Sequence, residues 1–438
     1  MGNSTLQRTL YGADQVGRDA YGGNPSLKFD ATGFFRLEKS NRWWLVTPDG
    51  SAFLSFGMNH ANPNLINQSY NADFWIKRFG GAKFGSPAYK KRLQQFVSNN
   101  LEAFGFNTLG VHNNFNTLHP AIRFPWIKSI PFVKTHHYLV STEEDFLDVF
   151  SPEFEKRCET LARKEAAPLK GDSFLLGYAM TDCPIFTELD AAARPTHVYG
   201  AKREALPTWP RVLRNLTAEA PGKQAYVAFM RTRYNGKIGA FNKTYATRFA
   251  NWSALAKASG WRTEFDSGNG KELQDNEAFL ETVLERYYSV STAAIRRNDP
   301  NHLIFGDKLN ANTNCAETVT HISAKYTDLV FYQQFGRWQE QRNILGRLSE
   351  ASGKALFNGD GAYHAPHDHM PDPHGPHALD QEHRADLAIE FAEHAFALDA
   401  FVGWSFCGWV DTWNTMPNKE LKQHGGIMDA FGKPYQPL

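Results

Sequence analysis

The chain has 438 residues, of which 42% are hydrophobic, 14% are aromatic and 21% are charged. This composition is typical of a globular, aromatic-rich protein and excludes a collagen, a coiled coil and a low-complexity chain. The 47 basic and 46 acidic residues give a net charge of +1, so bulk charge provides no basis for binding nucleic acid or a membrane surface.

Targeting and cysteine patterns carry little further information. The first residues lack the apolar stretch of a signal peptide, and no apolar run approaches the roughly 18 residues of a membrane span. The four cysteines have no CxxC spacing, which argues against a zinc site and a disulfide framework. We therefore expect a cytoplasmic protein without a cofactor, or a periplasmic or secreted one if a signal peptide was removed. The oligomeric state is left open.

The N-terminal residues predict a small β-structure. Residues 33–37 and 43–46 have the composition of paired strands, and Pro48-Asp49-Gly50 is a turn sequence that leads into a further strand at 52–56. We expect residues 1–50 to form an N-terminal hairpin structure that packs on a barrel of residues 51–438.

From residue 51 onward, strand candidates alternate with helix patterns such as 89–104 and 381–398. The eight strand candidates are 52–56, 107–111, 130–138, 174–180, 302–307, 327–333, 354–358 and 401–407. Strands that are apolar on both faces and alternate with helices predict a parallel (β/α)8 TIM barrel. An open doubly wound sheet is the alternative, but no glycine-rich phosphate loop follows the first strand.

The segment 185–300 is far longer than an ordinary connection between barrel strands. It leaves from the predicted end of the fourth strand, and barrel enzymes bind their substrates at these strand ends. We expect this insertion to form a lid or a wall of the substrate site.

Polar side chains gather at the predicted strand ends, where a barrel presents groups to a substrate. The candidate binding residues are Asn59, His60, His112, Asn113, Asp307, Lys308, Tyr332, Gln333, His364, Trp409, Asp411 and Trp413. A tryptophan ring is a suitable surface for the CH face of a pyranose. Core packing is the alternative for both tryptophans.

Two carboxylates at strand ends are the requirement for glycoside cleavage, because one donates a proton while the other attacks the anomeric carbon or activates water. Asp182 and Asp360 each follow an apolar or small-residue strand. We predict that Asp182 is the general acid/base and Asp360 the nucleophile or general base. The alternative for each is a helix cap or an ion pair, for example with Lys308. The reserve acids are Asp307, Asp411 and Glu188.

The segment 361–377 carries five histidines and two aspartates. Substrate contact, an ordinary surface loop and a metal site are all compatible with this density of imidazoles. The loop has no HExxH spacing and contains four prolines, so we expect substrate contact, with His364 as the representative residue, and no metal.

Several stretches resemble the agarases and agarase-like glycoside hydrolases, which are retaining enzymes on (β/α)8 barrels. The stretches are GFFRLEKSNRWWLVTPDGSAFLSFGMNH, FGFNTLGVHNN, DVFSPEFEKRC and FLLGYAMTDCP. A further stretch, AFMRTRYNGKIGAFNKTYATRFANW, is similar to one in barrel β-galactosidases, and KALFNGDGAY lies where such enzymes carry the nucleophile. The resemblance covers residues 33–435 and implies a glycosidase that degrades a galactan-like poly- or oligosaccharide, with a function in carbohydrate metabolism.

The resemblance also implies a divergent subfamily with an Asp/Asp pair. Agarases end the fourth strand in Asp-Asn-Glu, with the Glu as acid/base, whereas this chain has Thr181-Asp182-Cys183, and Asp360 stands where the nucleophile Glu is expected. We expect retention, and inversion if the two carboxyl groups stand about 6.5–9.5 Å apart. A non-catalytic carbohydrate-binding barrel and a metal-dependent hydrolase that uses the histidine-rich loop are the alternative functions.

Overall fold

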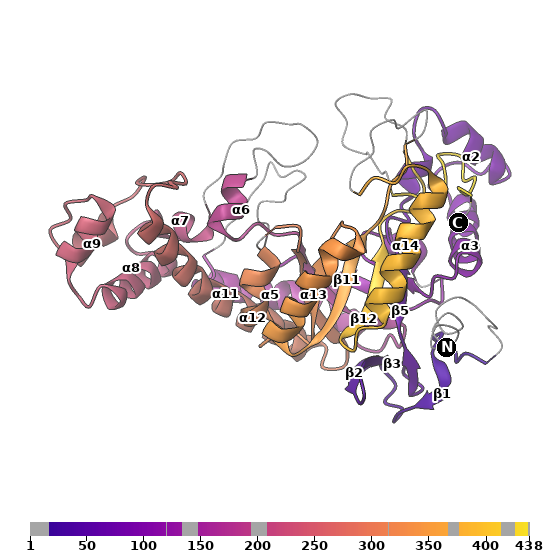
Figure 1. Cartoon of the computed structure of the whole chain (residues 1–438), viewed down its shortest axis with the longest axis horizontal. Helices are drawn as coiled ribbons and strands as arrows, with labels where there is room; N and C mark the ends of the chain where they lie inside the picture. Colours follow the sequence, from indigo (N-terminus) through magenta and orange to yellow (C-terminus); the bar gives the residue numbers. More distant parts are fainter. Residues whose placement is uncertain are drawn as a thin grey trace. The chain divides into compact units, whose positions relative to one another are not determined.

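The computed structural model describes residues 17–119, 121–133, 148–193, 208–313, 315–366, 376–412 and 425–436. Eight strands among them close into a barrel in the order β10-β11-β12-β5-β6-β7-β8-β9, and helices flank the barrel (Figure 1). The predicted (β/α)8 barrel is confirmed. None of the described helices is long and apolar enough to span a bilayer.

A four-stranded antiparallel sheet precedes the barrel, with the order β1-β4-β3-β2. Its strands are β1 (Asn24–Lys28), β2 (Arg36–Lys39), β3 (Trp43–Val46) and β4 (Ser51–Phe53). The turn before β4 requires glycine, because Gly50 has a φ of +82° and a Cβ there would lie 2.3 Å from the carbonyl oxygen of Phe29. The single strand predicted at 52–56 is wrong: residues 51–53 pair with β1 and β3, and the barrel begins at Ser55.

The barrel strands are β5 (Ser55–Met58), β6 (Thr108–Leu109), β7 (Trp126–Ser129), β8 (Leu175–Asp182), β9 (Leu303–Asn310), β10 (Leu329–Gln333), β11 (Ala355–Gly361) and β12 (Phe401–Phe406). The third strand was predicted at 130–138 and instead ends at Ser129. Pro131 has no N–H to donate to a neighbouring strand, and the apolar residues Ile130, Phe132 and Val133 are buried outside any strand. Their apolar character therefore reflects burial and not strand pairing.

The chain divides into two compact units. The first comprises Met1–Ser129, Gly171–Ala179 and Asp328–Leu438, and the second comprises Ile130–Lys170 and Met180–Thr327. The described helices of the first unit are η1 (Pro63–Ile66), α2 (Ala72–Arg78), α3 (Pro87–Ala103), α4 (Phe115–Leu118), α13 (Trp338–Ser352) and α14 (Gln381–Phe396). Those of the second are α5 (Pro152–Glu165), η2 (Ala167–Leu169), α6 (Glu188–Ala193), α7 (Trp209–Arg214), α8 (Pro221–Arg233), α9 (Ile238–Tyr245), α10 (Trp252–Lys257), α11 (Gly270–Asn298) and α12 (Cys315–Ser323).

The domain boundary expected at residue 50 and the lid expected at residues 185–300 stay predictions. The described part of that insertion is mainly helical, from α6 to α11.

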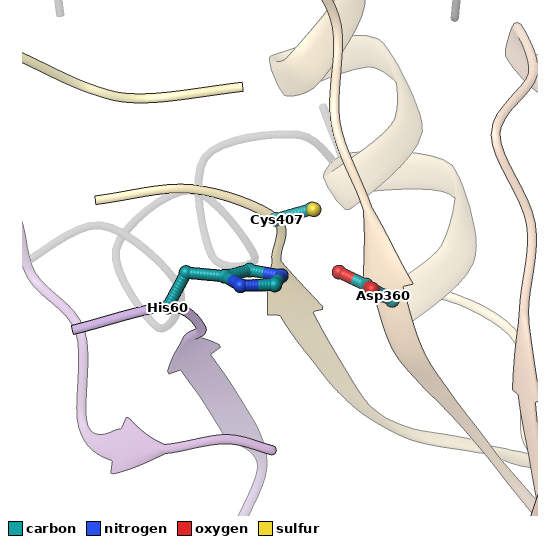
Figure 2. Close-up of side chains that lie close together, drawn as sticks. All are labelled: His60, Asp360 and Cys407. Atoms are coloured by element: carbon teal, nitrogen blue, oxygen red, sulfur yellow. The ribbon is translucent and has the colours of Figure 1, made fainter. Parts of the chain in front are cut away.

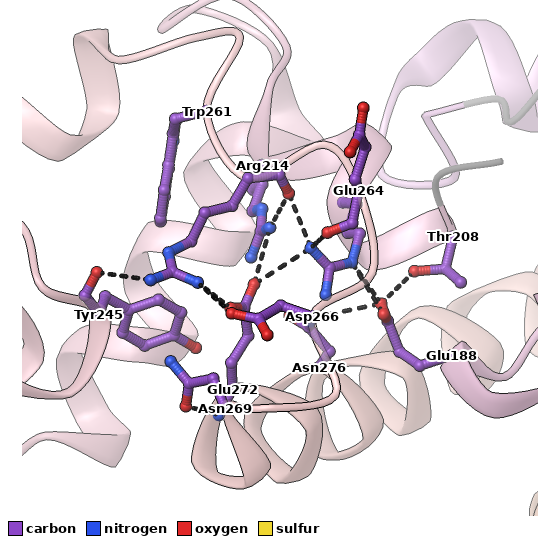
Figure 3. Close-up of polar contacts among 12 residues, drawn as sticks. Glu188, Thr208, Arg214, Tyr245, Trp261, Glu264, Asp266, Asn269, Glu272 and Asn276 are labelled. Atoms are coloured by element: carbon purple, nitrogen blue, oxygen red, sulfur yellow. Dashed lines mark hydrogen bonds and ion pairs between the residues drawn. The ribbon is translucent and has the colours of Figure 1, made fainter. Parts of the chain in front are cut away.

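A buried ionic network joins the helices of the second unit (Figure 3). The Glu272 carboxylate is fully buried and lies 2.9 Å from a guanidinium nitrogen of Arg214, 3.2 Å from one of Arg211 and 2.7 Å from one of Arg262. Arg211 also donates to both carboxylate oxygens of Glu188, at 3.0 and 2.8 Å. The network ties α6, α7 and α11 together, and the reserve acid Glu188 is thereby engaged inside the fold.

Asp411 anchors the C-terminal segment of the first unit. Its carboxylate accepts hydrogen bonds from the backbone N–H of Gly426 at 2.6 Å and from the hydroxyl of Tyr435 at 2.9 Å. Arg384 donates to the carbonyl oxygens of Gly425 and Gly426 beside it. Burial raises the pKa of the Asp411 carboxyl to about 7, against the opposing effect of Arg384.

We expect Glu272→Gln to destabilise the second unit by about 3–5 kcal/mol, because it leaves three guanidinium groups with one carboxylate fewer in a buried site. Urea unfolding followed by circular dichroism measures this change. Glu281→Gln is the matched control, since Glu281 lies on the same helix and its side chain is 59% exposed. Equal stability of the two variants would contradict the prediction.

We also expect the stability contributed by Asp411 to fall as the pH rises from about 4 to 7. In this window the folded chain holds a proton on Asp411 that the unfolded chain, in which the carboxyl has its ordinary pKa of 3.8, has released. The free energy of unfolding of the wild type, relative to that of Asp411→Asn, should fall by up to about 4 kcal/mol over this range. Urea titrations at each pH measure it, with the exposed Asp386→Asn as control. A pH-independent difference would show that the carboxyl does not titrate there.

Candidate active site

Asp360 lies near the C-terminal end of β11, the seventh barrel strand in chain order, and is 5% exposed. Its Oδ1 accepts a hydrogen bond of 2.9 Å from the side-chain amide of Asn59, which follows β5. The same amide nitrogen donates to the carbonyl oxygen of Gly359 at 2.8 Å. These two bonds hold the carboxylate in one orientation at the end of the barrel.

Asn59 itself is fixed by close backbone packing. It is fully buried, and its Oδ1 has no hydrogen-bond partner among the described residues. A Cβ at Gly110, after β6, would lie 2.1 Å from this oxygen. A glycine is therefore required at position 110. The sequence pattern did not identify this residue, although it lies within the stretch FGFNTLGVHNN.

Two histidines adjoin the carboxylate. His60 and His112 have φ values of 59° and 64°, in the left-handed region that non-glycine residues seldom adopt. Their rings stack with centroids 4.8 Å apart, and Nε2 of His112 lies 3.9 Å from Oδ2 of Asp360. Strained backbone of this kind concentrates at functional sites. Asn59, His60, His112 and Asp360, all predicted as site residues, are thus brought together in the first unit.

Asn113 belongs to the same strand ends, but backbone groups engage both of its polar atoms. Its Oδ1 accepts from the N–H of Ala61 at 2.6 Å, and its Nδ2 donates to the carbonyl oxygens of Met58 and Gly110 at 2.9 and 2.8 Å. This pattern favours positioning of the two strand ends over direct substrate binding.

Other predicted residues of the first unit are buried. The Tyr332 hydroxyl is fully buried, and burial raises its pKa well above the ordinary value. Gln333 and His364 are 2% and 4% exposed, and the His364 ring stacks on Phe335. Of the histidine-rich loop, residues 367–375 lie outside the described part of the chain.

The structure after the eighth barrel strand does not favour Trp409 as a surface for a sugar ring. Trp409 is fully buried and packs edge-on against Phe96, with centroids 6.0 Å apart. This favours the alternative of core packing. Asp411 is engaged with Gly426 and Tyr435 as described above, and Trp413 lies outside the described residues.

In the second unit, Asp182 ends β8, the fourth barrel strand. Its side chain is 36% exposed, and Oδ1 lies 2.9 Å from the ammonium of the buried Lys308. The next residue, Cys183, is buried with a φ of 42°. The alternative of an ion pair with Lys308 is therefore realised, while the carboxylate stays accessible to solvent.

Asp307 is enclosed by donors of its own unit. It accepts hydrogen bonds from the hydroxyls of Tyr287 and Tyr288, at 2.9 and 2.7 Å, and from the N–H of Thr181 at 2.7 Å. Burial raises its pKa to about 6. These contacts tie β8 and β9 to α11 and favour a structural role for Asp307.

Asp182 and Asp360 belong to different units. Their separation, and the stereochemistry that depends on it, stay predictions.

One group in the described part of the chain has the donor atoms to hold a metal ion. It consists of His60, Asp360 and Cys407, whose ligand atoms all lie within 4.8 Å of one another (Figure 2). Cys407 follows β12 and is half-buried. The four cysteines, all within the described residues, form no disulfide.

No protein-family model matches the chain, but two curated relatives from Vibrio sp. (strain JT0107) are similar to it in sequence. β-Agarase B is 21% identical over 496 residues, which cover 96% of this chain and 49% of that protein. β-Agarase A is 22% identical over 464 residues, which cover 90% of this chain and 44% of that protein. The chain thus spans about half the length of the curated relatives it matches.

Solved structures of agarases have the same fold. An exo-β-agarase superimposes with a TM-score of 0.77 at 18% identity, over 99% of this chain and 68% of that one. A second agarase superimposes with a TM-score of 0.73 at 19% identity, over 96% and 66% of the two chains. Together with the sequence matches, these similarities confirm the resemblance that the motifs indicate: the chain is similar in sequence to the β-agarases and shares the (β/α)8-barrel fold of solved agarase structures.

Proposed function

We propose that the chain is a glycoside hydrolase that cleaves a neutral, galactan-like poly- or oligosaccharide of the agarose type, with Asp360 as its nucleophile. The observation that carries the proposal is the buried Asp360 carboxylate at the end of the seventh barrel strand, oriented by the Asn59 amide. The relatives named as β-agarases support the reaction class. A cytoplasmic location belongs to the same proposal.

The geometry at Asp360 suits attack on an anomeric carbon. The Asn59 amide occupies Oδ1, so Oδ2 is the attacking oxygen. In the first step Oδ2 bonds to the anomeric carbon while the glycosidic C–O bond breaks and the leaving oxygen takes a proton. Water then cleaves the glycosyl ester and regenerates the carboxylate. His112, 3.9 Å from Oδ2, and His60, which stacks on it, are the proposed donors to sugar hydroxyls.

We propose Asp182 as the general acid/base. It has to donate a proton to the leaving oxygen in the first step and to accept one from water in the second. Its exposure gives it access to water, and the Lys308 ammonium 2.9 Å away is a partner for the ionised form that the second step requires.

A second function is favoured by the same ion pair. A carboxylate held by Lys308, with Cys183 where agarases carry the acid/base Glu, is compatible with a barrel that binds oligosaccharides without cleaving them. Calorimetric titration with agarose oligosaccharides, combined with product analysis after long incubation, separates the two functions, since binding without products favours the second.

We expect Asp360→Asn to lower kcat on agarose oligosaccharides by several orders of magnitude without loss of fold. The amide oxygen can still accept the Asn59 hydrogen bond, but the nucleophile is gone. Asp182→Asn should lower kcat by ~10² to 10⁴-fold, the contribution of general acid/base catalysis. Reducing-end assays with circular dichroism of each variant measure both effects.

The exposed Asp386→Asn provides the control for the same chemical change away from the site. Rescue of Asp360→Gly by azide, with formation of a glycosyl azide, reports a nucleophile and not a structural group. Full activity of Asp360→Asn would overturn the assignment.

We expect desulfated galactans to be cleaved at least as fast as their sulfated forms. A net charge of +1 provides no long-range attraction for a polyanion. Initial rates on matched sulfated and desulfated galactans measure this preference, and NMR of the first released anomer reports retention or inversion. A strong preference for the sulfated polymer would contradict the expectation of a neutral substrate.

A further inference from the structure

The Cys407 thiol has no function in a two-carboxylate mechanism, yet it lies beside the proposed nucleophile. Figure 2 shows His60, Asp360 and Cys407 converging from three separate strands. The strands are β5, β11 and β12, which are neighbours in the barrel order β11-β12-β5. Three different donor types therefore meet at adjacent strand ends of one compact unit.

Backbone hydrogen bonds fix these strand ends relative to one another. The N–H of Cys407 donates to the carbonyl oxygen of Gly361 at 3.0 Å, and the N–H of Asn59 donates to that of Phe406 at 3.0 Å. The first bond joins Cys407 to β11, and the second joins Asn59, the residue before His60, to β12. The arrangement of the three side chains is consequently a property of the barrel and not of a loose loop.

The donor set has the chemistry of a zinc site. Thiolate, imidazole and carboxylate are the ligands of Zn²⁺ in proteins, and Zn–N and Zn–S bonds of ~2.0–2.3 Å place tetrahedral ligand atoms ~3.3–3.8 Å apart. The three donor atoms lie within 4.8 Å of one another. Side-chain rotations that move these atoms by about 1 Å would therefore bring them to the separations of a tetrahedral site. His112, stacked on His60 and 3.9 Å from the Asp360 carboxylate, is the candidate fourth ligand.

The second hydrogen-bonding shell also fits a metal. A ligating carboxylate is ordinarily oriented by a hydrogen bond to its other oxygen. Asn59 makes this bond to Oδ1 of Asp360, and Oδ2 of the same carboxylate lies 3.9 Å from Nε2 of His112.

We propose that a thiophilic divalent cation, with Zn²⁺ as the best match, binds to His60, Asp360 and Cys407 and thereby switches off hydrolysis. This consequence rests on the proposed function of Asp360 as nucleophile. A carboxylate that coordinates a cation cannot attack an anomeric carbon at the same time, so metal and substrate exclude each other. The cation is an inhibitor of the site and not a catalytic cofactor.

Metal binding is tested first without reference to activity. The full chain, treated with a chelator and dialysed, is titrated with Zn²⁺ by calorimetry and with Co²⁺ by absorbance. We expect one cation per chain and a thiolate-to-cobalt charge-transfer band. Cys407→Ala should lose the band and weaken Zn²⁺ binding by at least about 100-fold, whereas the exposed His321→Ala should retain both.

A cation held by the histidine-rich segment 361–377 would bind without the thiolate band and would survive Cys407→Ala. That result would overturn the proposal. So would the absence of Zn²⁺ binding to the wild type below millimolar concentration.

Alkylation provides a test that does not depend on the folding of a variant. Cys158, Cys183 and Cys315 are buried, whereas Cys407 is half-buried. Iodoacetamide labelling with peptide mass spectrometry should modify Cys407 in the metal-free wild type, and Zn²⁺ should slow this modification at least tenfold. Labelling of Cys407 at the same rate with and without Zn²⁺ would also overturn the proposal.

The inhibitory consequence is measured as the ratio of hydrolysis rates with and without Zn²⁺. We expect Zn²⁺ to inhibit the wild type competitively and a chelator to restore its hydrolysis rate. The rate of each variant is compared with its own rate without metal. The ratio for Cys407→Ala should lie close to one. If Zn²⁺ binds as expected but no hydrolysis is found in any form, the proposed function fails while the metal site stands. If Zn²⁺ binds without lowering the rate, the exclusion fails.

Discussion

The side-chain amide of Asn59 donates to both the Asp360 carboxylate and the Gly359 carbonyl, and so connects the first barrel strand to the seventh. The orientation of the Asp360 carboxylate depends on this contact. It selects the carboxylate oxygen that faces His112, and it is possible only because position 110 carries no side chain. A larger residue there would displace the amide, and the orientation of the carboxylate would be lost with it.

The barrel and this strand-end cluster were accessible from the sequence because parallel strands buried on both faces appear as near-continuous apolar runs. Asn59, His60, His112 and Asp360 were all found by reading the residue after each such strand. The same reading failed at the third strand, where Pro131 interrupts an apolar run that is buried without pairing. Apolar content reports burial, and the pairing of backbone N–H and C=O groups with a neighbouring strand decides whether buried residues form a strand.

Side-chain roles were much less accessible, because they depend on contacts between residues far apart in the chain. The sequence pattern indicated Asp307 and Asp411, like Asp360, as acids near strand ends, yet tyrosine hydroxyls and backbone N–H groups enclose them. Trp409 lies past its strand and is nevertheless core. Position relative to a strand thus identifies candidates, whereas the surrounding donors determine which carboxylates stay available for chemistry.

The proposed nucleophile is an aspartate where the resemblance implies a glutamate, and this difference has a consequence for the neighbouring groups. A carboxylate that is one methylene shorter stays closer to the barrel wall, at the level of the strand ends where His60 and Cys407 lie. A thiol and an imidazole next to a carboxylate form a ligand set with high affinity for Zn²⁺. The short side chain of the proposed nucleophile therefore links two properties of this barrel. The position that makes Asp360 a candidate for glycosyl transfer also places it within reach of a metal ion that would compete for the same oxygen.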